Sequence, residues 1–172
     1  MESFLNPEQV LEKLRLRDNM TAVDFGSGSG GWTLPLAKKL KEGKIYAVDI
    51  LEDPLSALRG KAALEKVTNI ETIQVDLEKG LELPGECCDL VLINNLLFQT
   101  KNKKAILKEA RRLLRKRGKV LMVGWLPKVA LGPVNGRVSA ERVKSLTKDL
   151  GLELKKEFEA GSYHWGLIFK KA

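Results

Sequence analysis

Residues 23–31 read Val-Asp-Phe-Gly-Ser-Gly-Ser-Gly-Gly, and this stretch decides the fold of the chain. The apolar run at 20–25 predicts a buried strand, and a helical pattern follows from about residue 31 to residue 40. Glycines suit such a junction because the turn is tight and because a ligand can then approach bare backbone closely. The free N–H groups at the start of the helix also suit an anion. The stretch therefore predicts a ligand-binding loop.

The residues around the glycines bear on which ligand is bound. Gly26, Gly28 and Gly31 fit the G-x-G-x-x-G spacing of dinucleotide-binding loops, but a single match of this kind is a weak signal. Asp24 precedes the loop, and a carboxylate there would repel a diphosphate and favour a cationic or amine-bearing ligand. Asp49 ends the next expected strand, where an acid can accept hydrogen bonds from ribose hydroxyls. A plain structural turn and a plain strand-end acid are the simpler interpretations.

The rest of the chain alternates between strand-like and helical patterns. Strands are expected at 20–25, 44–49, 70–75, 89–94, 119–125, 152–160 and 163–170, and helices at 6–16, 31–40, 53–67, 101–117 and 139–150. Such alternation predicts a parallel sheet covered on both faces, and the last two strands predict a hairpin that adds an antiparallel edge.

Length and composition limit the classes of protein. A chain of 172 residues with 44% apolar and 30% charged residues suits one globular domain, which excludes disordered and fibrous classes. We expect a single domain over 1–172, with an N-terminal helical extension at 1–19 and a core at 20–172. No long apolar run or signal-peptide pattern is visible, which predicts a cytoplasmic protein. Cys87 and Cys88 are adjacent, and no metal-ligand spacing is visible, so no metal is expected.

The positive charge is concentrated in one window. Residues 101–119 hold ten basic residues and one acid, Glu109, although the whole chain has a net charge of only +8. An apolar stripe at helical spacing, including Ile106, Leu107 and Ala110, predicts a helix with basic outer faces that Gly118 closes. A solvated helix face is the simpler interpretation, and a surface that attracts nucleic acid or an acidic membrane is the alternative.

Taken in order, these motifs resemble the class I S-adenosylmethionine (SAM)-dependent methyltransferases. The resemblance covers residues 20–170 and rests on five motifs. They are the glycine motif at 23–30, Ile-Tyr-Ala-Val-Asp-Ile at 45–50, Gln-Val-Asp-Leu at 74–77, Asp-Leu-Val-Leu-Ile-Asn-Asn-Leu at 89–96, and the helix followed by a strand at 112–123. It implies an α/β fold: a three-layer Rossmann-like sandwich with helices on both faces of a seven-stranded, mostly parallel sheet. The implied strand order is 3-2-1-4-5-7-6, with strand 7 antiparallel. The branch that includes the quinone-biosynthesis methyltransferases is the most similar one.

The resemblance also implies roles for the glycine loop. Gly26, Gly28 and Gly30, with Ser27 between them, would let the backbone wrap the methionine part of SAM. Asp24 would lie near the ammonium group of that part.

Residues after the next three strands complete the implied cofactor site. Asp49 would hold the ribose diol, and Ile50 would pack on the adenine. Asp76 would accept a hydrogen bond from the adenine amino group, with the backbone of Leu77 beside it. The pair at 94–95, Asn94 and Asn95, would line the floor where the methyl group meets its acceptor.

The expected reaction is methyl transfer from SAM, with S-adenosylhomocysteine as the product. Because SAM already carries a good leaving group, the protein needs mainly to align the acceptor and exclude water. A general base is needed only for a weakly acidic acceptor, and the lone histidine, His164, is a weak candidate because such a residue is more often structural. The helix at 1–17 and the loop at 126–138 are candidates to close the pocket.

The acceptor is expected to be a small molecule, bound by a monomer or a homodimer. An RNA or protein methyltransferase that uses the basic 101–119 surface is the alternative within the same chemistry. A NAD(P)-binding Rossmann protein and a catalytically silent SAM-binding module are the alternatives from other classes.

Overall fold

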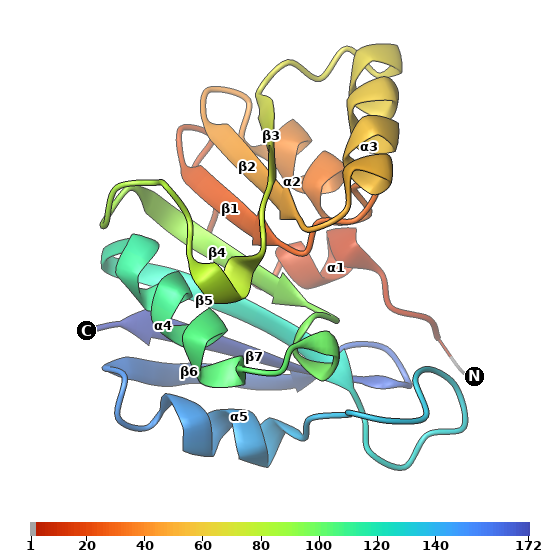
Figure 1. Cartoon of the computed structure of the whole chain (residues 1–172), viewed down its shortest axis with the longest axis vertical. Coiled ribbons are helices and arrows are strands. Elements are labelled where there is room, and N and C mark those ends of the chain that lie inside the picture. Colours follow the sequence, from red (N-terminus) through yellow and green to blue (C-terminus); the bar gives the residue numbers. More distant parts are fainter. Residues whose placement is uncertain (1–2) are drawn as a thin grey trace.

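Seven strands form one sheet in the order β3-β2-β1-β4-β5-β7-β6 (Figure 1). In the computed structural model, which describes residues 3–172, β1 to β5 pair in parallel and β7 is antiparallel to both of its neighbours. The strands are β1 (Thr21–Phe25), β2 (Lys44–Asp49), β3 (Ile70–Gln74), β4 (Cys88–Asn94), β5 (Leu114–Trp125), β6 (Leu152–Glu159) and β7 (His164–Lys171). This order and the antiparallel β7 confirm the predicted fold class.

Helices cover both faces of the sheet. They are α1 (Pro7–Leu11), α2 (Thr33–Lys39), α3 (Glu52–Leu64), α4 (Lys103–Leu113) and α5 (Ala140–Thr147), with short 3-10 turns η1 (Leu77–Lys79) and η2 (Leu97–Gln99). Apolar residues of α1, α2 and α3 join the sheet on one face, and those of α4 and α5 join it on the other. Asn6 and Ser139 cap α1 and α5 by accepting hydrogen bonds from the first-turn N–H groups.

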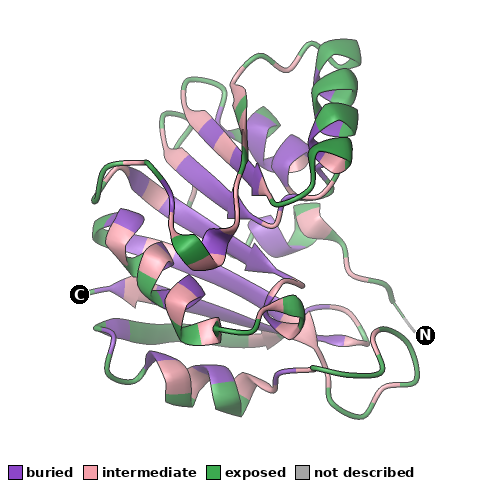
Figure 2. Cartoon of the chain, viewed as in Figure 1, coloured by how far each residue is buried: buried purple, intermediate pink, exposed green. Residues whose placement is uncertain are grey.

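The central strands are buried on both faces, as expected for a parallel sheet between two helical layers (Figure 2). In β1, Ala22 belongs to the apolar cluster of α1 and α2, whereas Val23 and Phe25 belong to the cluster of α4. Because β1 to β4 are parallel, the loops that follow them all lie at one edge of the sheet, the carboxyl edge.

The structure corrects the predicted basic helix. α4 ends at Leu113, and Leu114 pairs with Cys88 at the start of β5, whereas Lys119 pairs with Leu90. Residues 115–118 therefore form a bulge inside β5, where the register with β4 shifts. The basic residues of this bulge lie at the edge of the sheet where β4 and β5 begin, the amino edge, and not on a helix face. Leu114 is fully buried, which explains why a stripe of helical spacing continued past the end of the helix.

Other helix boundaries also differ from the prediction. α1 ends at Leu11, and the chain from 12 to 20 is irregular apart from turns, although Leu14 is buried. α3 begins at Glu52 with Leu51 as its cap, so Pro54 lies in its first turn. None of the helices in residues 3–172 has the length and apolar character needed to cross a bilayer.

Candidate functional site

A cavity of about 310 Å³ lies at the carboxyl edge, where β1, β2, β3 and β4 end. Ligands of open α/β sheets bind at this edge, and the size suits a small ligand. Seven of the predicted cofactor residues line the cavity: Gly26, Gly28, Asp49, Ile50, Asp76, Leu77 and Asn95. The other four, Asp24, Ser27, Gly30 and Asn94, are not among its lining residues.

Gly26, Gly28 and Gly30, in the loop after β1, differ in the space around the position that a Cβ would take. All three have positive φ, of 69° at Gly26, 53° at Gly28 and 99° at Gly30. A Cβ at Gly26 would lie 2.8 Å from the Leu96 side chain, and one at Gly30 would lie 2.4 Å from the Leu58 side chain. At these two glycines the space for a Cβ is therefore occupied by neighbouring side chains. A Cβ at Gly28 would meet nothing within 4 Å. Only Gly28 leaves open space on the cavity side of the loop.

Asp49 fixes this loop at the end of β2. One carboxylate oxygen accepts a hydrogen bond from the Gly28 N–H at 2.9 Å, and the other accepts one from the Leu51 N–H at 3.0 Å. Each carboxylate oxygen can accept more than one hydrogen bond. Asp49 therefore holds the glycine loop and keeps acceptor capacity for a pair of ligand hydroxyls.

Asp24 lies behind the loop, with only 2% of its surface exposed. The Thr33 hydroxyl donates a hydrogen bond to its carboxylate at 2.7 Å. Burial raises the pKa of Asp24 to about 7, the Thr33 hydrogen bond opposes this rise, and the negative charge of Asp49 adds to it. Asp24 thus places a titrating carboxyl under the cavity without lining it.

Asp76 and Ile50 lie on the far side of the cavity. The Asp76 carboxylate caps η1 by accepting a hydrogen bond from the Glu78 N–H at 3.0 Å. The Glu78 carboxylate in turn accepts a hydrogen bond from the N–H of Asn102, just before α4. Ile50 has 58% of its surface exposed, so an apolar side chain is available at the rim of the cavity. This side of the cavity offers both an acceptor and an apolar surface.

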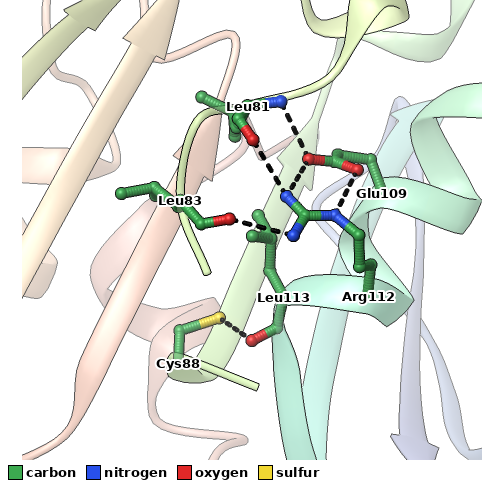
Figure 3. A network of polar contacts seen from close by, with 6 residues as sticks. All are labelled: Leu81, Leu83, Cys88, Glu109, Arg112 and Leu113. Carbon is green, nitrogen blue, oxygen red and sulfur yellow. Dashed lines mark hydrogen bonds and ion pairs between the residues drawn. The ribbon is translucent and has the colours of Figure 1, made fainter. Parts of the chain in front are cut away.

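A polar network holds the chain after η1 against α4 (Figure 3). Arg112 donates hydrogen bonds to the carbonyls of Leu83 at 2.9 Å and Leu81 at 3.0 Å, and it pairs with Glu109 at 2.6 Å. Glu109 also accepts a hydrogen bond from the Leu81 N–H, and the pair with Arg112 lowers its pKa. Arg112 belongs to the basic window of the sequence, but its charge is used inside the protein to hold the segment that follows Asp76.

The charges that line the cavity all have one sign. Asp49, Asp76 and Glu78 are among its lining residues, and no Lys, Arg or His among the described residues lines it. A ligand with a net negative charge would be repelled here, whereas a cation would be attracted. This distribution favours a sulfonium nucleoside over a dinucleotide with its pyrophosphate.

Buried polar groups without partners lie beside the cavity, where β4, β5 and β7 meet. Both polar atoms of the Asn94 side chain, Oδ1 of Asn95 and Nδ1 of His164 are buried and have no hydrogen-bond partner among the described residues. His164 Nε2 lies 3.4 Å from Nδ2 of Asn95, and the ring packs on Trp125 with the centroids 4.1 Å apart. Burial lowers the pKa of His164, which keeps the imidazole neutral at pH 7. Such unpaired groups are costly unless a ligand or water satisfies them.

Loop 126–138 lies next to this polar cluster and is held in shape by one side chain. The Arg137 guanidinium donates hydrogen bonds to four backbone carbonyls of the loop, those of Leu126, Val129, Leu131 and Pro133. The Trp165 indole donates a hydrogen bond to the Val138 carbonyl at 2.9 Å. Asn95, Trp125 and Arg137 line a common small hollow, so the loop packs beside the predicted acceptor side.

Sequence reasoning missed several residues of the site. The missed lining residues are Leu51, Pro54, Val75, Glu78, Leu96, Gln99, Thr100 and Ile106. Most of them follow a strand end by one to six residues, which is a usable signal. Ile106 was placed in the apolar stripe of a helix, and no sequence pattern indicates that the first turn of that helix opens on the cavity.

Comparisons with known proteins find methyltransferases among the proteins similar to this chain. The model of a family described as "Methyltransferase domain" matches residues 16–158. A Staphylococcus aureus protein named demethylmenaquinone methyltransferase is 30% identical over 117 residues, which make up 66% of this chain and 46% of that protein. A Methanosphaera stadtmanae protein named "Probable ribosomal RNA small subunit methyltransferase A" is 40% identical over 72 residues, 41% of this chain and 25% of that protein. The chain thus spans less than half the length of these two relatives.

A solved structure extends the likeness over nearly the whole chain. The crystal structure of a SAM-dependent methyltransferase from Aquifex aeolicus superposes with a TM-score of 0.89 and 23% identity, covering 98% of this chain and 90% of that one. At this identity the likeness establishes the fold, including the order of the sheet.

Proposed function

Because the chain belongs to the methyltransferase-domain family, we propose that it transfers a methyl group from SAM to a small-molecule acceptor. The family and the fold imply SAM as the cofactor. The observation that carries the proposal is the charge of the cavity, which has three carboxylates and no cationic side chain among its described lining residues. A cationic sulfonium nucleoside suits this lining, and the pyrophosphate of NAD(P) does not.

The residues present fit SAM. The open space at Gly28 is room that a Cβ would fill, and the cavity of about 310 Å³ lies against it. Asp49 would hold the ribose hydroxyls, Asp76 the adenine amino group and Ile50 the adenine face. The backbone of 26–30, with Asp24 beneath it, would hold the methionine part. These assignments follow the roles that the resemblance to the SAM-dependent methyltransferases implies.

The chain's own residues act on the acceptor by binding and orientation. Bound SAM supplies an activated methyl group on a sulfonium, so no strong catalyst is required of the protein. Asn95 lies between the cavity and His164 and can orient a polar acceptor group. The neutral His164 is the candidate to take a proton from a hydroxyl or amine acceptor at a ring nitrogen. Loop 126–138 would exclude water from this side.

A small acceptor is favoured by the burial of the polar cluster. Asn94 and His164 are 7% and 4% exposed, and loop 126–138 packs beside them. A small polar molecule can satisfy such groups, whereas a base within a folded RNA would have to be extruded to reach them. The Staphylococcus aureus relative, whose name refers to a quinone substrate, supports the same choice.

An RNA or protein acceptor is the second candidate. The Methanosphaera stadtmanae relative is named for ribosomal RNA, and the chain is basic overall. Against this candidate, the basic window of the sequence is divided between α4 and the amino edge, and residues 115–119 lie at the edge opposite the cavity.

Two measurements test the proposal. Thermal unfolding should shift upward with SAM and with S-adenosylhomocysteine but not with NAD. Methyl-labelled SAM should then label a fraction of small molecules from a cell extract, and not the RNA or protein fraction. Label in RNA or protein would replace the small acceptor by the second candidate. Binding of SAM without label in any fraction would indicate a silent module.

The role of His164 has its own readout. With the labelled acceptor in hand, His164→Gln should lower kcat by roughly 100-fold, the usual scale of a lost general base, and should flatten the acid limb of the pH profile. The KM for SAM should stay unchanged. A variant with normal kcat and an unaltered pH profile would assign His164 a structural role only.

A further inference from the structure

A second cavity, of about 470 Å³, lies at the amino edge of the sheet. It is lined by the segment 14–17 after α1, the beginnings of β4 and β5, and the end of β7. In Figure 1 this is the side where β4 and β5 begin and where the C-terminus lies. The cavity is therefore at the opposite edge from the cofactor site, and it shares no lining residue with that site.

The lining of this amino-edge pocket is strongly basic. Six cationic side chains contribute to it: Arg15, Arg17, Lys116, Arg117, Lys119 and Lys170. The only acid among its described lining residues is Asp89, and the Asp89 carboxylate already accepts hydrogen bonds from Arg115 at 3.0 Å and from the Thr21 N–H at 2.9 Å. No ion pair of the six cations is found within residues 3–172. The pocket lining thus carries a net positive charge.

Two of these lysines lie directly opposite each other. Lys119 of β5 and Lys170 of β7 are cross-strand partners, and like charges in this position destabilise a sheet. On its other side Lys170 faces Glu153 of β6, whose carboxylate pairs with Lys155 at 2.7 Å and also attracts Lys170. Burial lowers the pKa of Lys119, and the charges of Arg15 and Lys170 lower it further. Lys119 is therefore repelled by the other cations of the pocket.

The bulge of β5 at the pocket is also strained. Arg117 has φ of 69°, a left-handed conformation that side chains rarely adopt. Gly118, which follows it, leaves no room for a Cβ, because one would lie 2.9 Å from the Arg115 carbonyl oxygen. The chain keeps an arginine at a position where glycine would be less strained, and the arginine side chain lines the cavity.

We propose that the amino-edge pocket binds a di- or triphosphate group. Cations from separate segments surround a hollow, so several of them can contact one compact anion with several charges. Arginine forks and lysine ammonium groups are the usual partners of phosphate oxygens. The backbone of an RNA strand would instead call for a basic groove with aromatic side chains along it, and none of the described lining residues is aromatic. A polyphosphate would relieve the repulsion between Lys119 and Lys170.

Titration calorimetry with inorganic tripolyphosphate at physiological ionic strength tests this proposal. The double variant Arg117→Gly, Lys119→Gln removes two cations from the pocket and relieves both the strain and the repulsion, so it should fold normally. The matched control Lys104→Gln, Lys108→Gln removes two exposed cations from α4 and changes the net charge equally. The pocket variant should weaken tripolyphosphate binding by roughly 100-fold, since two charge-assisted hydrogen bonds are lost, and the control should change it by less than about twofold.

Two further arms complete the experiment. ATP as a second probe distinguishes the sources of the phosphate. Tighter binding of ATP than of tripolyphosphate indicates a nucleotide, and equal binding of the two indicates free polyphosphate. Both results support the proposal. Arg15→Gln, outside the sheet, should weaken binding in the same direction. Three outcomes overturn the proposal: no binding of tripolyphosphate, an equal loss in the α4 control, or binding of a 20-nucleotide RNA that tripolyphosphate does not displace. Affinity for SAM in the pocket variant should stay unchanged, which shows that the fold is intact.

Discussion

The two edges of the sheet differ in charge although the same strands connect them. At the carboxyl edge the cavity is lined by Asp49, Asp76 and Glu78, with no cationic side chain among its described lining residues. At the amino edge six cations line the pocket, and Asp89, the one acid among its described lining residues, is already paired. The parallel sheet provides a hollow at each edge, and the side chains of the loops decide the charge of the ligand that each can accept.

Both edges keep like charges together at a cost in stability. At the carboxyl edge the charge of Asp49 helps to raise the pKa of the buried Asp24. At the amino edge Lys170 and Arg15 lower the pKa of Lys119. Proteins retain such unfavourable arrangements mainly where a ligand needs them. The comparison therefore predicts that removing one of these charges weakens ligand binding at either edge. Where the removed charge is repelled by like charges, its removal should also raise the stability of the free protein.

Asp49→Ala should have the largest effect at the carboxyl edge. It removes the acceptor proposed for two ribose hydroxyls and leaves the Gly28 N–H without its partner. We expect the affinity for SAM, measured by calorimetry, to fall by roughly 100- to 1,000-fold, because hydrogen bonds to a charged group are strong.

The matched control is Asp53→Ala, which removes an exposed carboxylate from the first turn of α3. It changes the net charge equally and should leave the affinity for SAM within about twofold of the unaltered protein, because exposed charges contribute little. Equal losses in both variants would mean that overall charge, and not a ribose contact, attracts the ligand.

Gly28→Ala should have the next largest effect. The added methyl group enters the open space of the cavity, and a misfitted methyl group commonly costs roughly 10- to 100-fold in affinity. Because φ is 53°, alanine is also strained there and should lower the free energy of unfolding by about 1 kcal/mol. Gly31→Ala is the control, since a Cβ there meets nothing within 4 Å and φ is not positive. Retained affinity in Gly28→Ala would place the ligand elsewhere.

Asp24→Asn tests the buried carboxyl through its pH dependence. The pKa of Asp24 is raised from 3.8 to about 7 in the folded protein, so its ionisation opposes folding as the pH rises between these values. A nearby ligand ammonium group would favour the ionised form, and the affinity for SAM should therefore rise between pH 5.5 and 7, by up to about tenfold. In Asp24→Asn this rise should disappear, and the protein should be more stable than the unaltered one at pH 8. An unchanged pH dependence would separate Asp24 from the ligand.

The sequence was informative where a local pattern and a tertiary arrangement coincide. The glycine loop and Asp49 were predicted because the end of a buried strand is visible as an apolar run followed by polar residues. Parallel pairing then brings such ends together, and Gly26, Gly28, Asp49 and Asp76 indeed line one cavity. Their contacts with the cofactor stay predictions.

The sequence was less informative at the amino edge. The stripe of Leu113 and Leu114 continues helical spacing, but Leu114 extends to pair with β4 because its side chain is buried in the sheet. This pairing moved three basic residues, Arg115, Lys116 and Arg117, from the expected helix face to the amino edge, where Lys116 and Arg117 line the cavity. Lys119 and Lys170 lie opposite each other because of the register between β5 and β7. The two residues are about 50 positions apart in the chain, so no local sequence pattern shows that they are neighbours.

Lys119→Gln gives the smallest expected effect and sharpens the comparison in the free protein. Removing one of two opposed lysines should raise the free energy of unfolding by about 0.5 kcal/mol, or the Tm by about 1–2 °C, at low salt. The gain should shrink at high salt, because screening weakens the repulsion that is removed. Lys104→Gln on α4, an exposed lysine outside the pocket, should change the Tm by less than the Lys119 variant does. A loss of stability in Lys119→Gln would mean that the ammonium group is favourably paired. The amino edge would then, unlike the carboxyl edge, not hold its charge against repulsion.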